Sequence, residues 1–502
     1  MPLAPRRSEL VWRRREVAEM CSTGLGSRST QSEWWQRLTL AALTLAYAVY
    51  VAQAVATRGL FEYVGIDYQT FRASGEIART SGFAQIYDLA AQAQYQQPLR
   101  DQYSFGRWRI PFVQAPAPYL PVFVLPFLIL PSFAPIPGLV FWTLLSAGIL
   151  VIYLRQLLSA AGDEWRVSLP FELTLALPVF LTLLFGQINV WLLVFTGQFL
   201  LANARGRELR SGLWLGGLLL KPQTLILFLP GLLISRRFKV LAGWAISLLV
   251  ILAISAALAG MQGLQNLVQL VRLYPGNLPT TFPDSMMNWR ALTLNRALFL
   301  SSSVAWKLGM AGLAMSLVLG LALWLAPAPP ASGRFALVVL GTWAATAGVA
   351  WHSHVHMALP MLAPLLYLAL RQEVPRWLVH VWILGPSVLF LEEAFRVSPG
   401  QAHVLAGLAM LAVNSLVLGW VTRVLWSGGS AENADVGGSA TDSRPLQPTV
   451  ATTIQYRSMQ NRYVPHALTA TLNVIKTAET AVRRPRIPRA TSRIASGIRS
   501  KR

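Results

Sequence analysis

The first residue whose type and position could support chemistry is Asp67. It follows directly on the first long apolar run and opens a polar segment that extends to about Pro118. A carboxylate can act as a general base when it reaches an acceptor hydroxyl in a site shielded from bulk water. A position just beyond a membrane helix, under a folded loop, provides both conditions. The alternative role is an N-cap for a helix that starts at Tyr68, because aspartate is a favoured cap.

A second candidate is Lys221, which stands about ten residues into an otherwise uncharged run. Ionisable residues inside membrane helices are rare and usually face a cavity or a partner. Pro222 follows it, and proline removes a helical hydrogen bond and bends the helix. The pair therefore predicts a bent helix that exposes a cation to an anionic ligand such as a phosphate. The alternative is a lysine that extends its amino group to the membrane interface.

Polar side chains in two further breaks could bind a substrate. Gln187 and Asn189 interrupt a long apolar run directly after Gly186, and amides at a helix break can bind sugar hydroxyls or satisfy the freed backbone. Trp289 and Arg290 adjoin each other in a polar loop. Arginine suits a phosphate and tryptophan a sugar face, but the same pair can also anchor a helix at the interface.

Three histidines alternate at His352, His354 and His356, where two apolar runs meet. Residues two apart diverge on a helix, so metal binding would require an extended segment there. No acidic cluster accompanies the histidines in the sequence, and we assign no metal and no cofactor. We predict a polar or catalytic role for His352 or His354, with filling of the interface as the alternative.

The composition identifies the protein class that must position these residues. Of 502 residues, 54% are hydrophobic and 13% are charged, about half the charged fraction of soluble domains. Runs of 18 or more apolar residues can cross the hydrocarbon core as helices. We therefore predict an all-α polytopic membrane protein with about 10–12 transmembrane helices. The uncharged apolar runs cover 38–57, 111–154, 173–204, 240–271, 308–333, 335–370 and 397–422.

The order of these runs predicts the organisation of the chain. Residues 1–37 form a basic cytoplasmic segment, 38–426 the membrane domain, and 427–502 a basic, disordered tail. Large external loops are expected at about 58–118, with an amphipathic helix over 68–78, and at 261–303. The run 173–204 should form two short helices that meet at Gly186.

The basic residues around the expected span 211–235 conflict with a simple topology. Basic clusters stand at both ends of the expected span 211–235, whereas positive charge should gather on the cytoplasmic side alone. A break at Lys221 or the hinge at Gly186 must therefore change the number of membrane crossings, so that both basic clusters can lie on the cytoplasmic side. The clusters are Arg205, Arg207 and Arg210 before the span and Arg236, Arg237 and Lys239 after it.

The net charge of +22 does not indicate nucleic acid, because most of it lies at helix ends and in the tails. Such charges orient helices and contact anionic membrane lipids. The single cysteine, Cys21, cannot form an intrachain disulfide. The chain has no phosphate-binding Gly-rich loop of the Walker type and no dinucleotide fingerprint, so a nucleotide-bound donor in a soluble domain is not expected.

Several short motifs, taken in order over roughly 40–370, resemble the membrane glycosyltransferases of family 87 (GT87), which include polyprenyl-phosphate-mannose-dependent mannosyltransferases. The "SP" that precedes the histidine segment in that family is replaced here by Val349-Ala350. The motifs are Asp67-Tyr68, Ile86-Tyr87-Asp88, Tyr119-Leu120-Pro121, Gly186-Gln187-Ile188-Asn189, Gly216-Gly217, Lys221-Pro222, Asn288-Trp289-Arg290 and Trp351-His352-Ser353-His354.

The resemblance implies a GT-C glycosyltransferase fold with the active site in extracytoplasmic loops of a cell membrane, the inner membrane in a bacterium. It implies a polyprenyl-phosphate donor of mannose or another hexose or pentose, a glycolipid or glycan acceptor, and inversion. Carried over to this chain, Asp67 would be the catalytic base, and His352 or His354 would help to hold donor or acceptor. A flippase or transporter of a lipid-linked sugar is the alternative, although the long loop after the first span favours an enzyme.

Overall fold

The structure is a computed structural model that describes residues 34, 37–57, 59–103, 114–159, 172–273, 282–294, 300–396 and 399–427. Within these ranges every regular element is a helix, which confirms the all-α prediction. The predicted disordered tail after Ser427, and nearly all of the basic N-terminal segment, lie outside the described residues.

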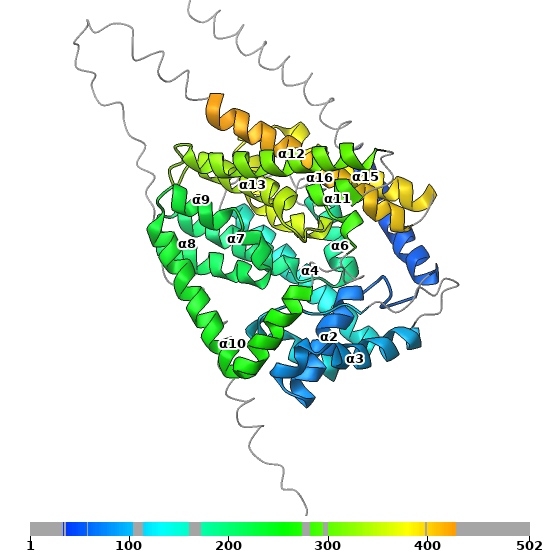
Figure 1. The fold of residues 1–502 in the computed structure, drawn as a ribbon. Coiled ribbons are helices and arrows are strands. Elements are labelled where there is room, and N and C mark those ends of the chain that lie inside the picture. The colour runs from blue at the N-terminus through cyan, green and yellow to red at the C-terminus, as the bar shows by residue number, and fades with distance from the viewer. Residues whose placement is uncertain are drawn as a thin grey trace, which may run out of the picture. The chain divides into compact units, whose positions relative to one another are not determined.

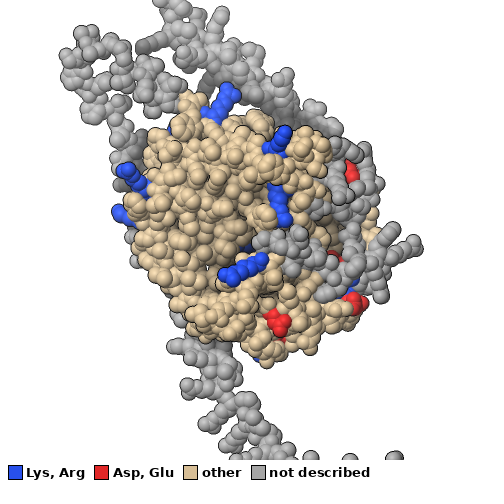
Figure 2. All heavy atoms as spheres, in the orientation of Figure 1, with Lys and Arg blue, Asp and Glu red and all other residues tan. Residues whose placement is uncertain are grey.

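Six of the helices are long and apolar enough to cross a membrane. This chain is therefore a multi-pass membrane protein, as the composition indicates. On the face shown in Figure 2, charged side chains are few and uncharged residues fill the surface between them. The six helices are Arg37–Thr57, Pro135–Leu158 (α4, Pro135–Ser159), α10 (Phe238–Leu273), Ser302–Leu325 (α12, Ser302–Ala322, with η9, Leu323–Leu325), Arg376–Phe395 (α15, Arg376–Arg396) and Ala402–Ser427 (α16, Pro399–Ser427).

Five apolar helical segments are shorter, with 10 to 17 residues each. At 1.5 Å per residue such a segment spans about 15–25 Å, less than the hydrocarbon core of about 30 Å. Each must therefore end within the membrane domain or continue through a break. The segments are η2 (Pro121–Ser132), α7 (Asn189–Ala204), Pro222–Ile234 (η4, Pro222–Leu225, and α9, Phe228–Ile234), α13 (Gly333–Val349), and Val355–Leu370 (η10, Val355–Met361, and α14, Leu362–Leu370).

The segment before Lys221 runs alongside the first turns of α10. It consists of α8 (Glu208–Leu215) and η3 (Gly216–Leu220). A Cβ on Gly212 would lie 1.9 Å from the Val240 carbonyl oxygen, and the Ser247 hydroxyl donates to the Leu213 carbonyl at 2.9 Å. Later residues of α8 thus contact later residues of α10, so the two helices are parallel and start at the same end.

The chain returns to that end after Lys221, because Glu208 and Arg237 line one cavity there. Residues 208–234 therefore form a hairpin with Lys221 at its tip, and the single span expected over 211–235 is wrong. Because the chain turns back at Lys221 instead of crossing the membrane, both basic clusters lie at one end. We call this the basic end; it carries Arg205, Arg207, Arg210, Arg236, Arg237 and Lys239.

Two other short helices connect the basic end to the level of Lys221. The Asn203 amide, near the end of α7, donates to the Pro330 carbonyl at 3.4 Å. A neighbouring carbonyl, that of Ala328, accepts from Arg237 at 2.5 Å. Consequently α7 ends and α13 starts at the basic end, and their other ends lie deep in the membrane domain.

The predicted hinge after Gly186 is confirmed. Helix α6 (Leu177–Phe185) ends at Gly186, whose φ of 71° is left-handed, and α7 begins at Asn189. A Cβ on Gly186 would lie 2.7 Å from the Tyr68 Cβ. The hinge therefore requires glycine both for its backbone conformation and for close approach to the segment that carries Asp67.

Residues 66–103 form the layer that covers these short helices. They contain α2 (Ile66–Thr80), η1 (Phe83–Tyr87) and α3 (Leu89–Tyr103), so the predicted amphipathic helix over 68–78 is confirmed. Gly75 brings α2 onto η2, since a Cβ there would lie 2.2 Å from the Phe127 carbonyl oxygen. Figure 1 shows α2 and α3 together beside the second part of α10.

The helix α10 links the basic end to this layer. It is kinked at Gly260, where φ is 66° and ψ is 179°, and then continues to Leu273. The Asn266 side chain donates to the Ala84 carbonyl of η1 at 3.2 Å. The polar loop expected over 261–303 therefore begins with a helix that packs on the covering layer, and it later contains η7 (Pro283–Ser285) and α11 (Trp289–Leu294).

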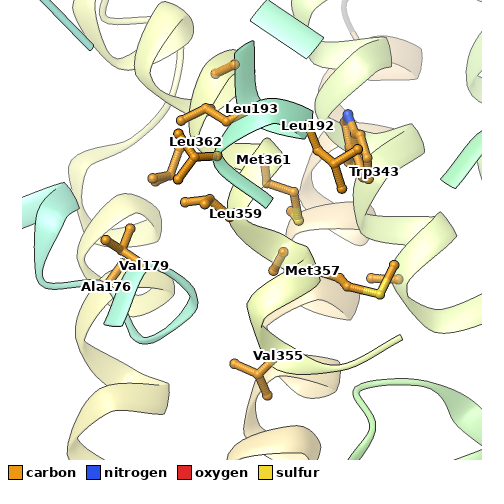
Figure 3. Packing of buried hydrophobic residues seen from close by; sticks show 14 of the residues in the cluster. Ala176, Val179, Leu192, Leu193, Trp343, Val355, Met357, Leu359, Met361 and Leu362 are labelled. Carbon is orange, nitrogen blue, oxygen red and sulfur yellow. The ribbon is translucent and has the colours of Figure 1, made fainter. Parts of the chain in front are cut away.

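The core beneath the layer is built around η10 and α14. Figure 3 shows Met357, Leu359 and Met361 of this stretch between Leu192 of α7 and Val179 of α6, with Trp343 of α13 nearby. Their side chains are at most 4% exposed. Burial of apolar side chains on several sides holds this non-spanning stretch in place.

We expect Gly186→Ala to lower the stability of the protein by about 1–3 kcal/mol, because alanine disfavours the left-handed backbone and its methyl group would clash with Tyr68. Thermal unfolding of the purified protein in detergent would measure the change. Gly148→Ala is the matched control, since nothing lies within 4 Å of a Cβ on this residue of α4. Equal melting temperatures for the two variants would contradict the role assigned to Gly186.

Candidate active site

Asp67 lies in the first turn of α2, above the hinge between α6 and α7. The N-cap of α2 is Gly65, with a φ of 76°, and no side chain caps this helix. The N-cap role considered for Asp67 is therefore wrong. The Gly65 amide donates instead to the Leu184 carbonyl of α6 at 2.8 Å, which fixes the start of α2 over the hinge and leaves the Asp67 carboxylate for other partners.

Gln187 connects Asp67 to Lys221. The Lys221 amino group donates to the Gln187 side-chain oxygen at 3.1 Å, and the Gln187 amide hydrogen-bonds to the Asp67 carboxylate. Lys221 is 7% exposed and Gln187 is 5% exposed, whereas Asp67 is partly exposed. The tip of the hairpin, the α6–α7 hinge and the covering layer thus meet at one polar cluster.

The environment of Asp67 gives its carboxyl group an unusual pKa. Burial raises the pKa to about 6, although the Gln187 hydrogen bond and the positive charge of Lys221 both lower it. The effect of burial on the Asp67 pKa is therefore larger than the opposing effects of Gln187 and Lys221 together. An acid with a pKa near neutrality can accept a proton and later release it, which is the property of a general base.

The backbone at His354 is extended, whereas His356 lies in η10, and the segment before η10 is held by the loop before α11. The Asn288 side chain donates to the Ala350 and Trp351 carbonyls at 2.8 and 3.1 Å, and Met286 forms an antiparallel bridge with His354. The guanidinium of Arg290 lies 3.8 Å from the centre of the Trp351 ring. Arg290 is thereby fixed next to the histidine segment.

His352 shares the electrostatic environment of Lys221. Its pKa lies well below the usual value because of burial first, and then because of positive charge on His354, Lys221 and Arg290. The rings of His352 and His354 lie 4.9 Å apart. A neutral imidazole among cations can accept or donate a hydrogen bond without adding to the local charge.

Within the described ranges, no group of three or more His, Cys, Asp or Glu side chains is arranged to hold a metal ion. The polar groups of the cluster are one carboxylate, two cations, an amide and imidazoles. This set suits an anionic substrate that also offers hydroxyl groups.

Residues 118–347 match the model of glycosyltransferase family 87. Over these residues, a little under half of its length, the chain is similar to the glycosyltransferases of family 87. No curated protein and no solved structure is significantly similar to the chain. This glycosyltransferase therefore carries Gln187, Lys221 and Arg290 within the matched region, whereas Asp67 and the histidine segment lie outside it.

Two of the predicted substrate-binding residues of the glycosyltransferase have structural contacts instead. The Trp289 indole nitrogen donates to the Ser316 hydroxyl at 2.8 Å, and its ring packs against Gly312 of α12. Asn189 is fully buried and donates to the Thr182 hydroxyl at 3.4 Å. These contacts place Trp289 between helices and Asn189 within the hinge. They explain both residues as structural and do not support a direct substrate role for either one.

Two further groups, the side chains of Gln223 and Tyr63, help to position the cluster and give little signal in the sequence. The Gln223 amide donates to the His352 carbonyl at 3.5 Å, and its position two residues after Lys221 was the only signal. The Tyr63 hydroxyl hydrogen-bonds to both Tyr50 and His403. These contacts tie the first helix and α16 to the turn before Asp67, although residues so distant in sequence gave no pattern to find.

We expect kcat/KM for glycosyl transfer to fall below about pH 6, tenfold per pH unit, because protonated Asp67 cannot accept a proton. In Gln187→Met the acidic limb should move to higher pH, since the variant loses a hydrogen bond that lowers the Asp67 pKa. A pH–rate profile measures both effects.

The control for this profile is Gln223→Met, which removes an amide that contacts His352 rather than Asp67 and should leave the limb in place. A limb that moves to lower pH in Gln187→Met, or a rate independent of pH between 5 and 7, would contradict the assignment.

Proposed function

We propose that this glycosyltransferase moves a sugar from a polyprenyl-phosphate donor to the hydroxyl of a glycolipid or glycan, with inversion of the anomeric carbon. The observation that carries the proposal is the linked cluster of Asp67, Gln187 and Lys221. It combines a base with a cation beneath a covering layer, at a point where several membrane helices end. The sugar we favour is mannose or another hexose or pentose, on the strength of the motif resemblance.

In the proposed reaction Asp67 accepts the proton of the acceptor hydroxyl as its oxygen attacks the anomeric carbon. The bond from that carbon to the phosphate oxygen breaks, and polyprenyl phosphate leaves with the bonding electrons. One displacement inverts the carbon. The pKa of about 6 supports this role, because the carboxylate is ionised at neutral pH and still basic enough to take part in proton transfer.

Positive charge near the cluster would stabilise the leaving phosphate. Lys221 and Arg290 both act on His352 electrostatically, and we propose that the two cations flank the phosphate of the donor. Fixed cations aimed at a developing charge lower the barrier most where water is excluded. Neutral His352, with His354 beside it, would hydrogen-bond to the sugar or the acceptor.

The short helices suit a lipid-linked donor. From the basic end to Lys221 the hairpin rises by about 20 Å, less than the hydrocarbon thickness of about 30 Å. The polar cluster therefore lies near the opposite membrane surface, where a prenyl chain can remain in the bilayer while its phosphate reaches Lys221. With the basic end in the cytoplasm, the reaction would occur on the extracytoplasmic side of the cell membrane. In a bacterium this membrane is the inner membrane.

We expect Asp67→Asn to reduce kcat by about 10²–10⁴-fold, because asparagine cannot act as a base. The assay supplies radiolabelled polyprenyl-phosphate sugars to membranes that contain the protein and separates the labelled glycolipids. Glu76→Gln is the matched control: Glu76 lies nine residues further along α2 and so faces the opposite side of the helix. Unchanged transfer by Asp67→Asn would exclude Asp67 as the base.

We expect Lys221→Met to weaken binding of the polyprenyl-phosphate donor at least tenfold without lowering the melting temperature. The variant removes the desolvation cost of a buried cation, and the Asp67 carboxyl group, whose pKa rises without Lys221, can take up a proton instead of remaining an unpaired anion. Donor binding in detergent and thermal unfolding are the two measurements. If the variant binds the donor as tightly as the wild type does, Lys221 does not contact the donor phosphate.

A further inference from the structure

A cavity of about 660 Å³ opens at the basic end, and the proposed reaction does not use it. It lies between the end of α9, the start of α10 and the chain after η9. The side chains that line it combine cations with apolar groups, plus one carboxylate. They belong to Glu208, Ile234, Ser235, Arg236, Arg237, Phe238, Lys239, Trp324, Leu325, Ala326, Pro327, Ala328 and Pro330.

The cations of the cavity lie in one turn and the start of one helix. Arg237 is fixed, because it donates to the Ala328 carbonyl at 2.5 Å and lies 4.5 Å above the Phe335 ring. Arg236 and Lys239 are exposed. Three cations and the single carboxylate of Glu208 give the lining a net charge of +2, so the cavity favours an anion.

Large apolar side chains are exposed on the rim of the same cavity. Phe238 is 60% exposed, Leu325 is 64% exposed and Ile234 is 40% exposed. Exposed apolar groups beside cations are typical of protein surfaces that contact lipid at the headgroup level. Figure 2 shows basic side chains at the left margin of the molecule, over the region of α8 and α9 in Figure 1.

The cavity and the covering layer that carries Asp67 lie at opposite ends of the first part of α10. From Phe238 to the kink at Gly260, α10 has a length of about 33 Å, close to the thickness of the hydrocarbon core. Beyond the kink, Asn266 contacts η1 of the covering layer. A lipid phosphate bound at Arg236 therefore cannot at the same time reach Lys221.

We propose that this cavity binds the headgroup of an anionic phospholipid from the leaflet at the basic end. Arg236 and Lys239 contact its phosphate, and the acyl chains lie along Phe238 and Leu325. The basic end faces the cytoplasm if positive charge follows its usual distribution, and anionic lipids of the cytoplasmic leaflet attract such clusters.

Native mass spectrometry of the purified full chain in detergent tests the proposal by titration with phosphatidylglycerol and with phosphatidylcholine. The wild type should retain phosphatidylglycerol preferentially. The double variant Arg236→Gln, Lys239→Gln should weaken that binding by on the order of tenfold. The matched control is Arg205→Gln, Arg210→Gln, which removes two charges from the same end but outside the cavity and should bind as the wild type does.

Equal retention of the two lipids, or equal losses of binding in the two double variants, would overturn the proposal. Displacement of bound phosphatidylglycerol by low millimolar inorganic phosphate would also overturn it, because it would indicate a general anion site. A raised KM for the polyprenyl-phosphate donor in Arg236→Gln, Lys239→Gln would overturn it by assigning the cavity to the donor. If that variant does not elute as a monodisperse protein, Lys239→Gln alone should weaken binding about threefold to fivefold.

Discussion

The hydrogen bond from Lys221 to Gln187 is the interaction on which the arrangement of this membrane domain depends. An ammonium group within an apolar protein core is stable only where a polar partner or water reaches it. The chain supplies that partner from a second helix break, 3.1 Å away. Because the two breaks must meet, the hairpin tip and the α6–α7 hinge lie at one level, and α2 can cover both.

The same constraint explains why several apolar helices are too short to cross a bilayer. Helix α7 starts at the cluster, α13 stops close to it, and the hairpin turns there. Where these segments end, their polar groups can bond to each other rather than face lipid. For the proposed transfer from a lipid-linked donor, such a meeting point would bring polar groups to the phosphate while the prenyl chain stays in the bilayer.

Much of the fold could be predicted because polar residues interrupt long apolar runs. Gly186 and Pro222 marked real breaks, and the pattern after Asp67 marked a real helix. The link from Asp67 through Gln187 to Lys221 could not be predicted, since 154 positions separate Asp67 from Lys221 and neither apolar run indicates its neighbour. The contacts of Trp289 with Gly312 and Ser316 were likewise not predictable, because the sequence shows only an aromatic residue in a polar loop. Gln187 was identified as a polar hinge residue, but only the structure shows that it links the Asp67 carboxylate to the Lys221 amino group.

The hairpin over 208–234 also affects how such chains are mapped. A hydropathy count takes this stretch as one crossing, and every later loop is then assigned to the opposite compartment. A map drawn from that count would place the chain after Val240 on the wrong side of the membrane, and it would separate the loop that holds Arg290 from Asp67. One re-entrant turn is enough to put on opposite sides of such a map residues that the folded chain holds on one side.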